Sequence, residues 1–342
     1  MLLPGIGAEG QRRLGEAHVV IVGVGALGCA SADLLCRAGV GSLTLIDRDV
    51  VEESNLHRQT LFVQADADEM MPKAVAAAAR LRAINPGVAV RAEVEDLSKS
   101  NASRLVGDGA AAILDGTDNF ETRYLLNDVS VKIGLPLAYA GVVGTGGMQA
   151  TFVPPAGACL RCVFPEPPPP GSTPTCDTAG VLNAVVVIAA AHQVTDVVRL
   201  IVTGEASPTT LVAFDPWNGT QRRLPLGEAK NNGCPCCGLR RFDWLEGGNG
   251  SRATVLCGQD SVQIAASLGA RVAGVAARPD LEALAARWRT VGTVRVTPHL
   301  ARGEFVERGR AVTITMFADG RCVVGNTREV EEARVLMARY VG

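Results

Sequence analysis

The feature that most constrains the fold of this chain is the alternation of short apolar segments with helix-like segments over its first half. Repeated apolar runs, each followed by an amphipathic or Ala-rich run, are typical of βα units, whose strands pair in parallel through right-handed crossovers. The pattern therefore predicts an α/β fold with a Rossmann-like, mostly parallel sheet. Strands are expected at residues 18–23, 43–47, 88–93, 110–115 and 136–140, and helices at 26–38, 73–84, 97–106 and 120–133.

After Gly147 the pattern changes and predicts an antiparallel continuation of the sheet. A Pro- and Gly-rich loop at 165–174 cannot pack as a regular element. Short strands separated by turn residues then indicate hairpin pairing. Strands are expected at 148–153, 209–214 and 220–226, and an apolar helix at 180–203.

A Gly-Gly-Asn-Gly run marks a boundary near the C-terminal third of the chain. The segment 245–251 is expected to be a linker between a main domain at 1–244 and a small α+β module at 252–342, of ubiquitin-like or ferredoxin-like type. The module could dock a partner, or it could serve packing or dimerisation. Its strands are expected at 254–257, 293–297, 305–307, 311–317 and 321–325, and its helices at 280–289 and 329–339.

Composition argues against several classes of protein. A formal net charge of -2 gives no sign of nucleic-acid or anionic-membrane binding. The N-terminus lacks the basic-then-apolar run of a signal peptide. No uninterrupted apolar stretch reaches membrane-spanning length, and the segment 181–191 is too short. A cytoplasmic protein is expected, with no nucleic-acid or membrane partner. In a reducing compartment, its ten cysteines more often bind metal or do chemistry than form disulfides.

A Gly-x-Gly-x-x-Gly segment at 23–28 follows the first strand and opens the first helix. Glycines there permit a tight turn and bring backbone N–H groups and a helix N-terminus against phosphate. Asp47 ends the next strand, where a carboxylate can hold ribose hydroxyls. On these residues alone an NAD enzyme is the default, and glycines that merely turn a loop are the structural alternative.

The residues after Asp47 favour nucleotidyl transfer over hydride transfer. Ser-Asn-Leu-His-Arg-Gln at 54–59 and Pro-Lys at 72–73 precede Asp-Gly-Thr-Asp-Asn at 115–119, which ends a strand. When a carboxylate attacks the α-phosphorus of ATP and pyrophosphate leaves, cations must neutralise the phosphates and a carboxylate must hold Mg²⁺. Hydride transfer has no such need.

These motifs together resemble those of the ThiF/MoeB/HesA adenylyltransferases, relatives of the ubiquitin-activating enzymes, over residues 2 to about 240. The resemblance implies ATP-dependent adenylation of the C-terminal glycine carboxylate of a small ubiquitin-like sulfur-carrier protein ending in Gly-Gly. It implies that Arg58, Lys73 and Asp118 are catalytic, with Asp118 as the Mg²⁺ ligand. The implied nucleotide-binding residues are Gly23, Gly25, Ala26, Gly28, Asp47, Asp49, Asn55, Arg58, Gln59, Lys73, Asp118 and Asn119.

Each of these residues also has a simpler local interpretation. Asn55 could cap a turn, Arg58 could be a surface cation, and Asp118 precedes a helix that it could cap. Other functions share the same nucleotide site: adenylation of a peptide or a tRNA base, or nucleotide binding by a regulator without catalysis. The carrier could belong to thiamine or to molybdopterin biosynthesis, and the sequence does not distinguish the two.

Two Cys-x-x-Cys pairs, Cys159/Cys162 and Cys234/Cys237, predict a structural Zn²⁺ site. Four thiolates close a tetrahedral site, and the same pairs sit at the matching places of the family. Cys236 adjoins Cys237 and would give a poorer ligand spacing. A redox pair is the alternative, although a redox Cys-x-x-Cys usually opens a helix after a strand.

Cys176 follows the Pro-rich loop and precedes the apolar helix, so a mobile loop could present its thiol as a nucleophile. By resemblance, a cysteine in this region becomes linked to the carrier in the thiamine branch but is dispensable for activation in the molybdopterin branch. Cys176 is therefore a candidate catalytic residue whose covalent role stays open.

The resemblance also concerns the start of the chain. Family members usually carry an Arg-Tyr-x-Arg-Gln segment before a Leu-Leu-Pro-Gly-Ile-Gly stretch, and its arginine reaches the partner's ATP in a homodimer. Here Met1 stands directly before that stretch. A homodimer is expected, with the true start and its arginine upstream of Met1; loss of the arginine is the alternative.

Overall fold

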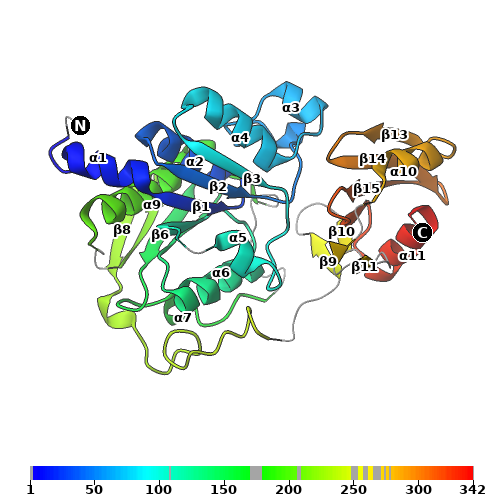
Figure 1. Ribbon diagram of the computed structural model, residues 1–342. Helices are drawn as coiled ribbons and strands as arrows, with labels where there is room; N and C mark the ends of the chain where they lie inside the picture. The colour runs from blue at the N-terminus through cyan, green and yellow to red at the C-terminus, as the bar shows by residue number, and fades with distance from the viewer. Residues whose placement is uncertain are drawn as a thin grey trace. The chain divides into compact units, whose positions relative to one another are not determined.

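The computed structural model describes residues 3–107, 109–169, 179–205, 209–247, 253–256, 261–264, 271–272, 275–276 and 279–341. The chain divides into two compact units, Met1–Gly248 and Asn249–Gly342. Figure 1 shows the first unit in blue to yellow-green and the second in yellow to red.

The first unit is built on an eight-stranded sheet with strand order β3-β2-β1-β4-β5-β6-β7-β8. The first five strands in this order pair in parallel, and β6 to β8 pair antiparallel. The predicted fold class is thereby confirmed. The strands are β1 (His18–Val22), β2 (Ser42–Ile46), β3 (Ala89–Glu93), β4 (Ala112–Asp115), β5 (Leu137–Val143), β6 (Gly146–Phe152), β7 (Thr210–Asp215) and β8 (Thr220–Pro225).

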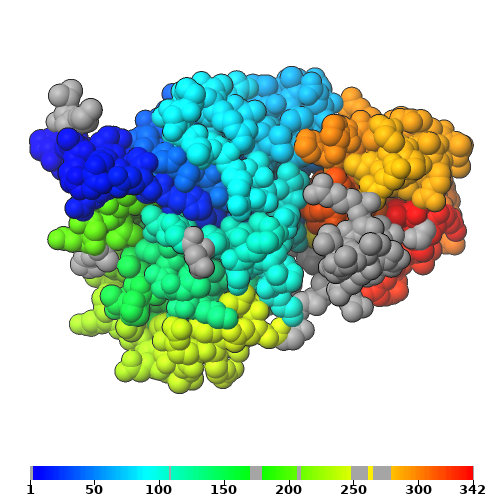
Figure 2. All heavy atoms as spheres, viewed as in Figure 1, coloured from blue at the N-terminus to red at the C-terminus, as the bar shows by residue number. Residues whose placement is uncertain are grey.

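Helices cover both faces of this sheet, because each buries an apolar side against it. One core cluster joins α1, α2, α4 and α9 to the strands, and another joins α5 and α6 to the opposite face (Figure 1). The blue residues of α1 lie directly against the green surface of α9 in Figure 2. The helices are α1 (Gly7–Glu16), α2 (Ala26–Ala38), α3 (Gln64–Asp68), α4 (Lys73–Ile84), α5 (Ala102–Val106), α6 (Phe120–Ile133), α7 (Leu160–Val163) and α9 (Asn183–Thr203), with 3₁₀ turns at Glu53–Asn55 and Gly227–Ala229.

Helix α5 is shorter than predicted because a side chain competes for the backbone at its start. The Oδ1 atom of Asn101 accepts the N–H of Ser98, and its Nδ2 donates to the carbonyl of Asp96. These bonds fold 96–101 into a turn, so the helix begins only at Ala102. Helix α1 was not predicted, since its buried side is reduced to Gly10 and Leu14.

Helix α9 is the one helix among the described residues that is long and apolar enough, by length and composition, to cross a membrane. Its apolar run is interrupted by polar residues such as Gln193 and Asp196, so the expectation that no uninterrupted apolar stretch reaches spanning length is not contradicted. Helix α9 is a core helix: Val185, Ala189 and Val197 are buried, and it packs on α2 and on strands β5 and β6. Its buried Gln193 donates hydrogen bonds to the carbonyls of Asp115 and Ala138, which ties the helix to the sheet.

The first unit continues through residues 245–247, which were expected to belong to the linker. Leu245 is buried, and its N–H and that of Trp244 donate to Asp128 on α6. Lys132 pairs with Glu246 at 2.7 Å. The remainder of the expected linker, 248–251, lies outside the described residues.

The second unit carries a six-stranded antiparallel sheet with order β13-β14-β15-β16-β10-β9 and a separate β11–β12 pair. Trp288 and Phe305 pack edge to face in its core, and Phe305 stacks on Tyr340. Strand β10 was not predicted, because its four residues carry too short an alternation. The elements of the second unit are β9 (Ala253–Leu256), β10 (Ser261–Ile264), β11 (Arg271–Val272), β12 (Val275–Ala276), α10 (Leu281–Trp288), β13 (Thr293–Val296), β14 (Leu300–Glu307), β15 (Arg310–Phe317), β16 (Cys322–Gly325) and α11 (Val330–Tyr340).

Candidate active site

The glycine loop after β1 lies at the point where the strand order reverses between β1 and β4, which is where open α/β sheets bind ligands. Gly23 has φ +83° and donates its N–H to the carbonyl of Ile46 at 2.8 Å. A Cβ on Gly28 would lie 1.9 Å from the Gly23 oxygen, and one on Gly116 2.4 Å from the same oxygen. Gly23 in the loop after β1, Gly28 in the first turn of α2 and Gly116 after β4 are thus packed backbone to backbone.

Gly25 has a different role from its two neighbours in the motif. It stands at the N-cap of α2, and no side chain caps the helix there. A Cβ added to Gly25 would have Nε2 of Gln59 as its nearest neighbour, at 3.9 Å. The first N–H groups of α2, beginning at Ala26, are therefore not capped by a side chain and are available to an anion.

Substitution at these glycines is expected to separate folding from binding. Gly28→Ala forces a backbone clash and should lower the free energy of unfolding by about 3 kcal/mol. Gly25→Ala should leave the melting temperature near that of the wild type but weaken ATP binding, because its methyl group occupies the phosphate approach. Thermal unfolding and calorimetric titration of both variants check this, and equal melting temperatures for the two would contradict it.

Asp47 shapes the loop as well as facing the site. Its Oδ2 accepts the N–H of Val24 at 2.6 Å and its Oδ1 the N–H of Asp49 at 2.7 Å. Burial raises the pKa of Asp47, and the Lys73 cation opposes this. The buried carboxylate therefore connects the β1 loop to the β2 loop.

Lys73 begins α4 and is almost fully buried. Its side-chain Nζ lies 3.5 Å from Oδ2 of Asp49, and its main-chain N–H donates to the Asp49 carbonyl. Burial lowers the pKa of Lys73, but the carboxylates of Asp49, Asp47, Asp118 and Glu52 outweigh it, so the net shift is upward. A buried cation that stays charged can neutralise a phosphate.

The loop after β4 places Asp118 in solvent and assigns capping to its neighbour. Oδ1 of Asn119 accepts the N–H of Thr122 at 2.8 Å and so caps α6. Asp118 is exposed, and no described residue hydrogen-bonds to its carboxylate. The alternative that Asp118 caps the helix is therefore wrong. Asn119 was expected to bind nucleotide, and its side-chain oxygen instead accepts the capping hydrogen bond of α6.

Two supporting residues of this loop were missed by the sequence interpretation. Asp115 accepts the N–H and hydroxyl of Thr117. Arg123 donates to the carbonyls of Thr117 and Ala140, and its Nε forms an ion pair with Oδ2 of Asp115 at 3.3 Å. Burial raises the pKa of Asp115, opposed by the Arg123 cation. The pair fixes the loop that carries Asp118.

The segment 54–59 contributes polar groups of three kinds. Asn55 is buried and its carbonyl accepts the N–H groups of Arg58 and Gln59. Arg58 is half-buried, with Nη1 donating to the Ser54 carbonyl. Gln59 is buried, and its Oε1 finds no hydrogen-bond partner among the described residues. That orphaned oxygen and the uncapped helix beside it suit a polar ligand such as ATP.

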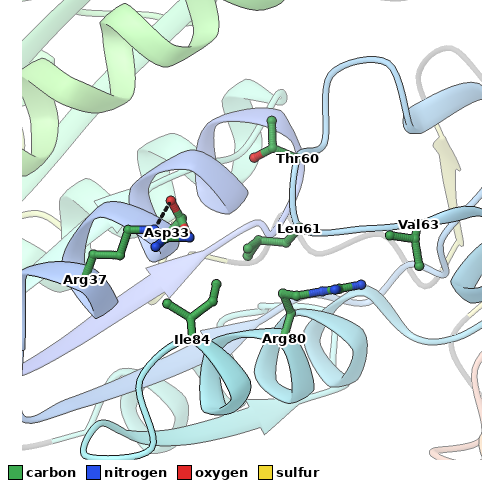
Figure 3. Close-up of a pocket in the computed structure, with 7 residues that line it drawn as sticks. All are labelled: Asp33, Arg37, Thr60, Leu61, Val63, Arg80 and Ile84. Atoms are coloured by element: carbon green, nitrogen blue, oxygen red, sulfur yellow. Dashed lines mark hydrogen bonds and ion pairs between the residues drawn. The ribbon is translucent and has the colours of Figure 1, made fainter.

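The pocket drawn in Figure 3 lies elsewhere. It encloses about 410 Å³ between α2, α4 and the loop 60–63, and contains none of the expected site residues. Asp33 on α2 and Ile84 on α4 stand toward the C-terminal ends of their helices, and each residue adds about 1.5 Å along the axis. The nucleotide site is at the opposite, N-terminal ends, so this pocket is not part of it.

The four cysteines expected to bind zinc converge. Their sulfurs all lie within 4.8 Å of one another. The Cys159–Cys162, Cys159–Cys234 and Cys162–Cys237 Sγ separations are 3.9, 3.7 and 3.3 Å. Tetrahedral Zn²⁺ with bonds of about 2.3 Å would separate its sulfurs by about 3.8 Å. The four sulfurs therefore fit a Zn²⁺ ion. A redox site needs only one pair of cysteines, so the convergence of two pairs favours metal binding over the redox alternative.

Helix α6 holds both cysteine knuckles. Asn127 accepts the N–H of Leu160 at 2.9 Å through Oδ1, and its Nδ2 lies 3.2 Å from Sγ of Cys236. Cys236 is thus engaged with α6 and is outside the group of four. Cys176 lies outside the described residues.

Comparison with known proteins gives consistent similarities. The ThiF family model matches residues 1–236. The Bacillus subtilis sulfur carrier protein ThiS adenylyltransferase is 40% identical over 338 residues, covering 98% of this chain and 96% of the relative. The SAMP-activating enzyme E1 of Haloferax volcanii is 40% identical over 247 residues, covering 72% and 89%. MccB of E. coli, crystallised with ATP, has a TM-score of 0.59 and 21% identity over 67% of this chain and 69% of its own, a likeness of fold alone.

Proposed function

Because this chain belongs to the ThiF family, we propose that it uses ATP to adenylate the C-terminal glycine carboxylate of a small ubiquitin-like sulfur-carrier protein. The observation that supports this most directly is the juxtaposition of unlike charges at the strand-order reversal. The carboxylates of Asp49 and Asp47, with a smaller contribution from exposed Asp118, raise the pKa of buried Lys73, and α2 begins after the β1 loop without a side-chain cap. This arrangement suits phosphate chemistry at a carboxylate-held metal.

In the proposed reaction, a carrier carboxylate oxygen attacks the α-phosphorus of ATP. The bond from that phosphorus to the bridging oxygen breaks, giving carrier acyl-AMP and pyrophosphate. Lys73 and Arg58 would offset the phosphate charge, the first N–H groups of α2 would donate to phosphate oxygens, and Asp47 would accept from ribose. Mg²⁺, held by Asp118, would supply further charge neutralisation on the phosphates.

Carrier-dependent ATP–pyrophosphate exchange tests this function. The purified chain should exchange labelled pyrophosphate into ATP only when a cognate carrier with a free Gly-Gly terminus is present. A carrier whose terminal glycine is removed is the matched control. Exchange with a peptide or tRNA instead of any carrier would show a different substrate, and ATP binding without exchange would show a regulator.

A ThiS-type carrier is the first candidate to test. The Bacillus subtilis relative is similar along both units of this chain, whereas the Haloferax volcanii relative covers 72% of it. The similarity across the second unit supports a carrier of the thiamine type. The second unit would then serve docking or packing in that enzyme.

We also propose a structural Zn²⁺ at Cys159, Cys162, Cys234 and Cys237, a homodimer, and a cytoplasmic location. Thiolates kept for metal binding suit a reducing compartment. Elemental analysis and sedimentation of the purified chain test the first two.

Cys176→Ala is expected to retain carrier-dependent pyrophosphate exchange, because adenylation is complete once pyrophosphate leaves. Overall sulfur transfer should fall only if this thiol attacks the acyl-adenylate and releases AMP, or takes the outer sulfur of a donor persulfide and releases the donor thiol. Both assays on one preparation, with non-reducing mass spectrometry for a carrier adduct, distinguish these roles. Loss of exchange itself would place Cys176 in the adenylation site, contrary to the proposal.

A further inference from the structure

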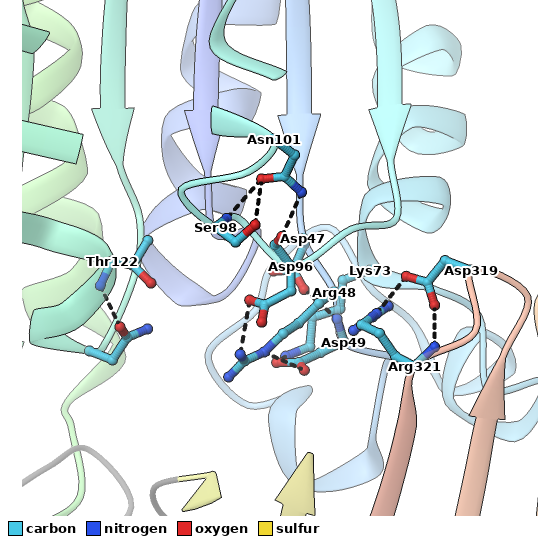
Figure 4. Close-up of polar contacts among 11 residues, drawn as sticks. Asp47, Arg48, Asp49, Lys73, Asp96, Ser98, Asn101, Thr122, Asp319 and Arg321 are labelled. Carbon is cyan, nitrogen blue, oxygen red and sulfur yellow. Dashed lines mark hydrogen bonds and ion pairs between the residues drawn. The ribbon is translucent and has the colours of Figure 1, made fainter. Parts of the chain in front are cut away.

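The acidic edge of the nucleotide site contains a cation that the proposed mechanism does not use. Arg48 stands between Asp47 and Asp49 directly after β2. Its Nη1 donates to Oδ1 of Asp96 at 2.9 Å, and its Nε lies 3.6 Å from Oδ1 of Asp49 (Figure 4). One guanidinium therefore joins the loop after β2 to the loop after β3.

The two carboxylates that Arg48 joins come from the loops after two neighbouring strands, Asp49 after β2 and Asp96 after β3. Asp49 faces Lys73, with its Oδ2 3.5 Å from Nζ, and its carbonyl accepts the Lys73 N–H. Asp96 lies in the turn that Asn101 closes through its bonds to Ser98 and to the Asp96 carbonyl (Figure 4). A continuous series of polar contacts thus runs from that turn through Arg48 and Asp49 to Lys73.

We infer that Arg48 is a positioning residue for ATP: by bridging Asp96 and Asp49 it fixes the loop after β3 at the ligand edge and keeps Asp49 and Lys73 aimed at the phosphates. The inference rests on the proposed use of ATP. Arg48 is three-quarters buried, so the bridge is partly shielded from water and from screening by salt. Burial lowers the pKa of Arg48, but Asp49, Asp96, Asp47 and Asp118 outweigh it, so the guanidinium stays charged.

A simpler electrostatic role makes the opposite prediction for one variant. If Arg48 only offset negative charge, removing the Asp96 carboxylate would relieve repulsion and tighten ATP binding. If the bridge positions the site, Asp96→Asn removes its ion pair, loosens the bridge and weakens ATP binding although it removes a negative charge. The sign of the Asp96→Asn effect therefore separates the two roles.

The test measures binding of α,β-methylene ATP with Mg²⁺ by calorimetry, and the ATP dependence of pyrophosphate exchange. Arg48→Gln and Asp96→Asn should each raise the dissociation constant and the KM for ATP about tenfold, with kcat changed less than about twofold. The double variant should bind the nucleotide no more weakly than either single variant does. Arg48→Lys, which keeps the charge and one bond, should lose only about threefold.

Arg91→Gln is the matched control, because the Arg91 side chain on β3 is exposed and pairs with Glu93 of the same strand at 2.8 Å. It should bind the nucleotide like the wild type. The inference is overturned if Asp96→Asn tightens binding, if the two single effects add, or if Arg48→Gln binds normally. If Arg48→Gln does not fold, the sign of the Asp96→Asn effect decides alone. If the wild type binds the nucleotide but exchanges with no carrier, the proposed function fails while this binding test still stands.

Discussion

Asp118→Asn is expected to lower carrier-dependent pyrophosphate exchange by about 10³-fold or more, with the fold intact. The reason is that two neighbouring residues in the loop after β4 have different roles. Asn119 supplies the cap of α6, so the Asp118 carboxylate is exposed and available to a metal. Asparagine keeps the shape of the side chain but not the charge that would hold Mg²⁺ against the phosphates.

The controls for this variant separate chemistry from folding. Its melting temperature should match the wild type, because the Asn119 cap is untouched. Asp68→Asn, which changes an exposed carboxylate on α3, should retain full exchange. Near-normal exchange in Asp118→Asn would refute the assignment, and a large loss of stability would show that the carboxylate supports the fold.

Loss of the zinc site is expected to produce the largest effect on stability. Cys159→Ser or Cys237→Ser should lower the melting temperature of the first unit by about 10 °C and reduce bound zinc from about one ion per chain to near none. The metal would join the segment at Cys159 to the segment at Cys234, which are also connected through Asn127 of α6 and through the Arg161–Asp243 ion pair. Differential scanning calorimetry and elemental analysis measure the two effects.

Cys236→Ala is the matched control, because its sulfur lies outside the group of four. It should keep the zinc, with only the modest loss expected for a buried thiol. A zinc-free wild type, or a Cys236→Ala variant that loses zinc while Cys237→Ser keeps it, would show that the ligand set is wrong.

Much of the first unit could be predicted from local pattern. The bounds of α2, α4 and α6 agree with the sequence interpretation because each has an uninterrupted helical run. Helices α2 and α6 also end at glycines, Gly39 and Gly134, which take φ values of +81° and +73°. A glycine in a left-handed conformation ends a helix whatever surrounds it. The β1 loop and the two Cys-x-x-Cys pairs were visible for the same reason, since their chemistry depends on short spacing.

Only the tertiary structure decided between adjacent residues that could take the same role. The sequence offered Asp118 as a possible cap of α6, and only the backbone geometry assigns the cap to Asn119. Cys236 and Cys237 are neighbours, and only the fold brings Cys237 to Cys162. Such choices depend on contacts between residues far apart in the chain, which local propensity does not encode.

The same distinction explains the support around the site. The sequence determined which strands and helices follow one another along the chain, the glycine turn, and the residue types available to bind phosphate and metal. It did not show that Gly116 packs against Gly23, or that Arg123 and Gln193 hold the carbonyls of the β4 end. Those contacts form only when the sheet brings β1 and β4 side by side, because the close packing that makes each glycine and each buried polar group necessary exists only in the folded chain.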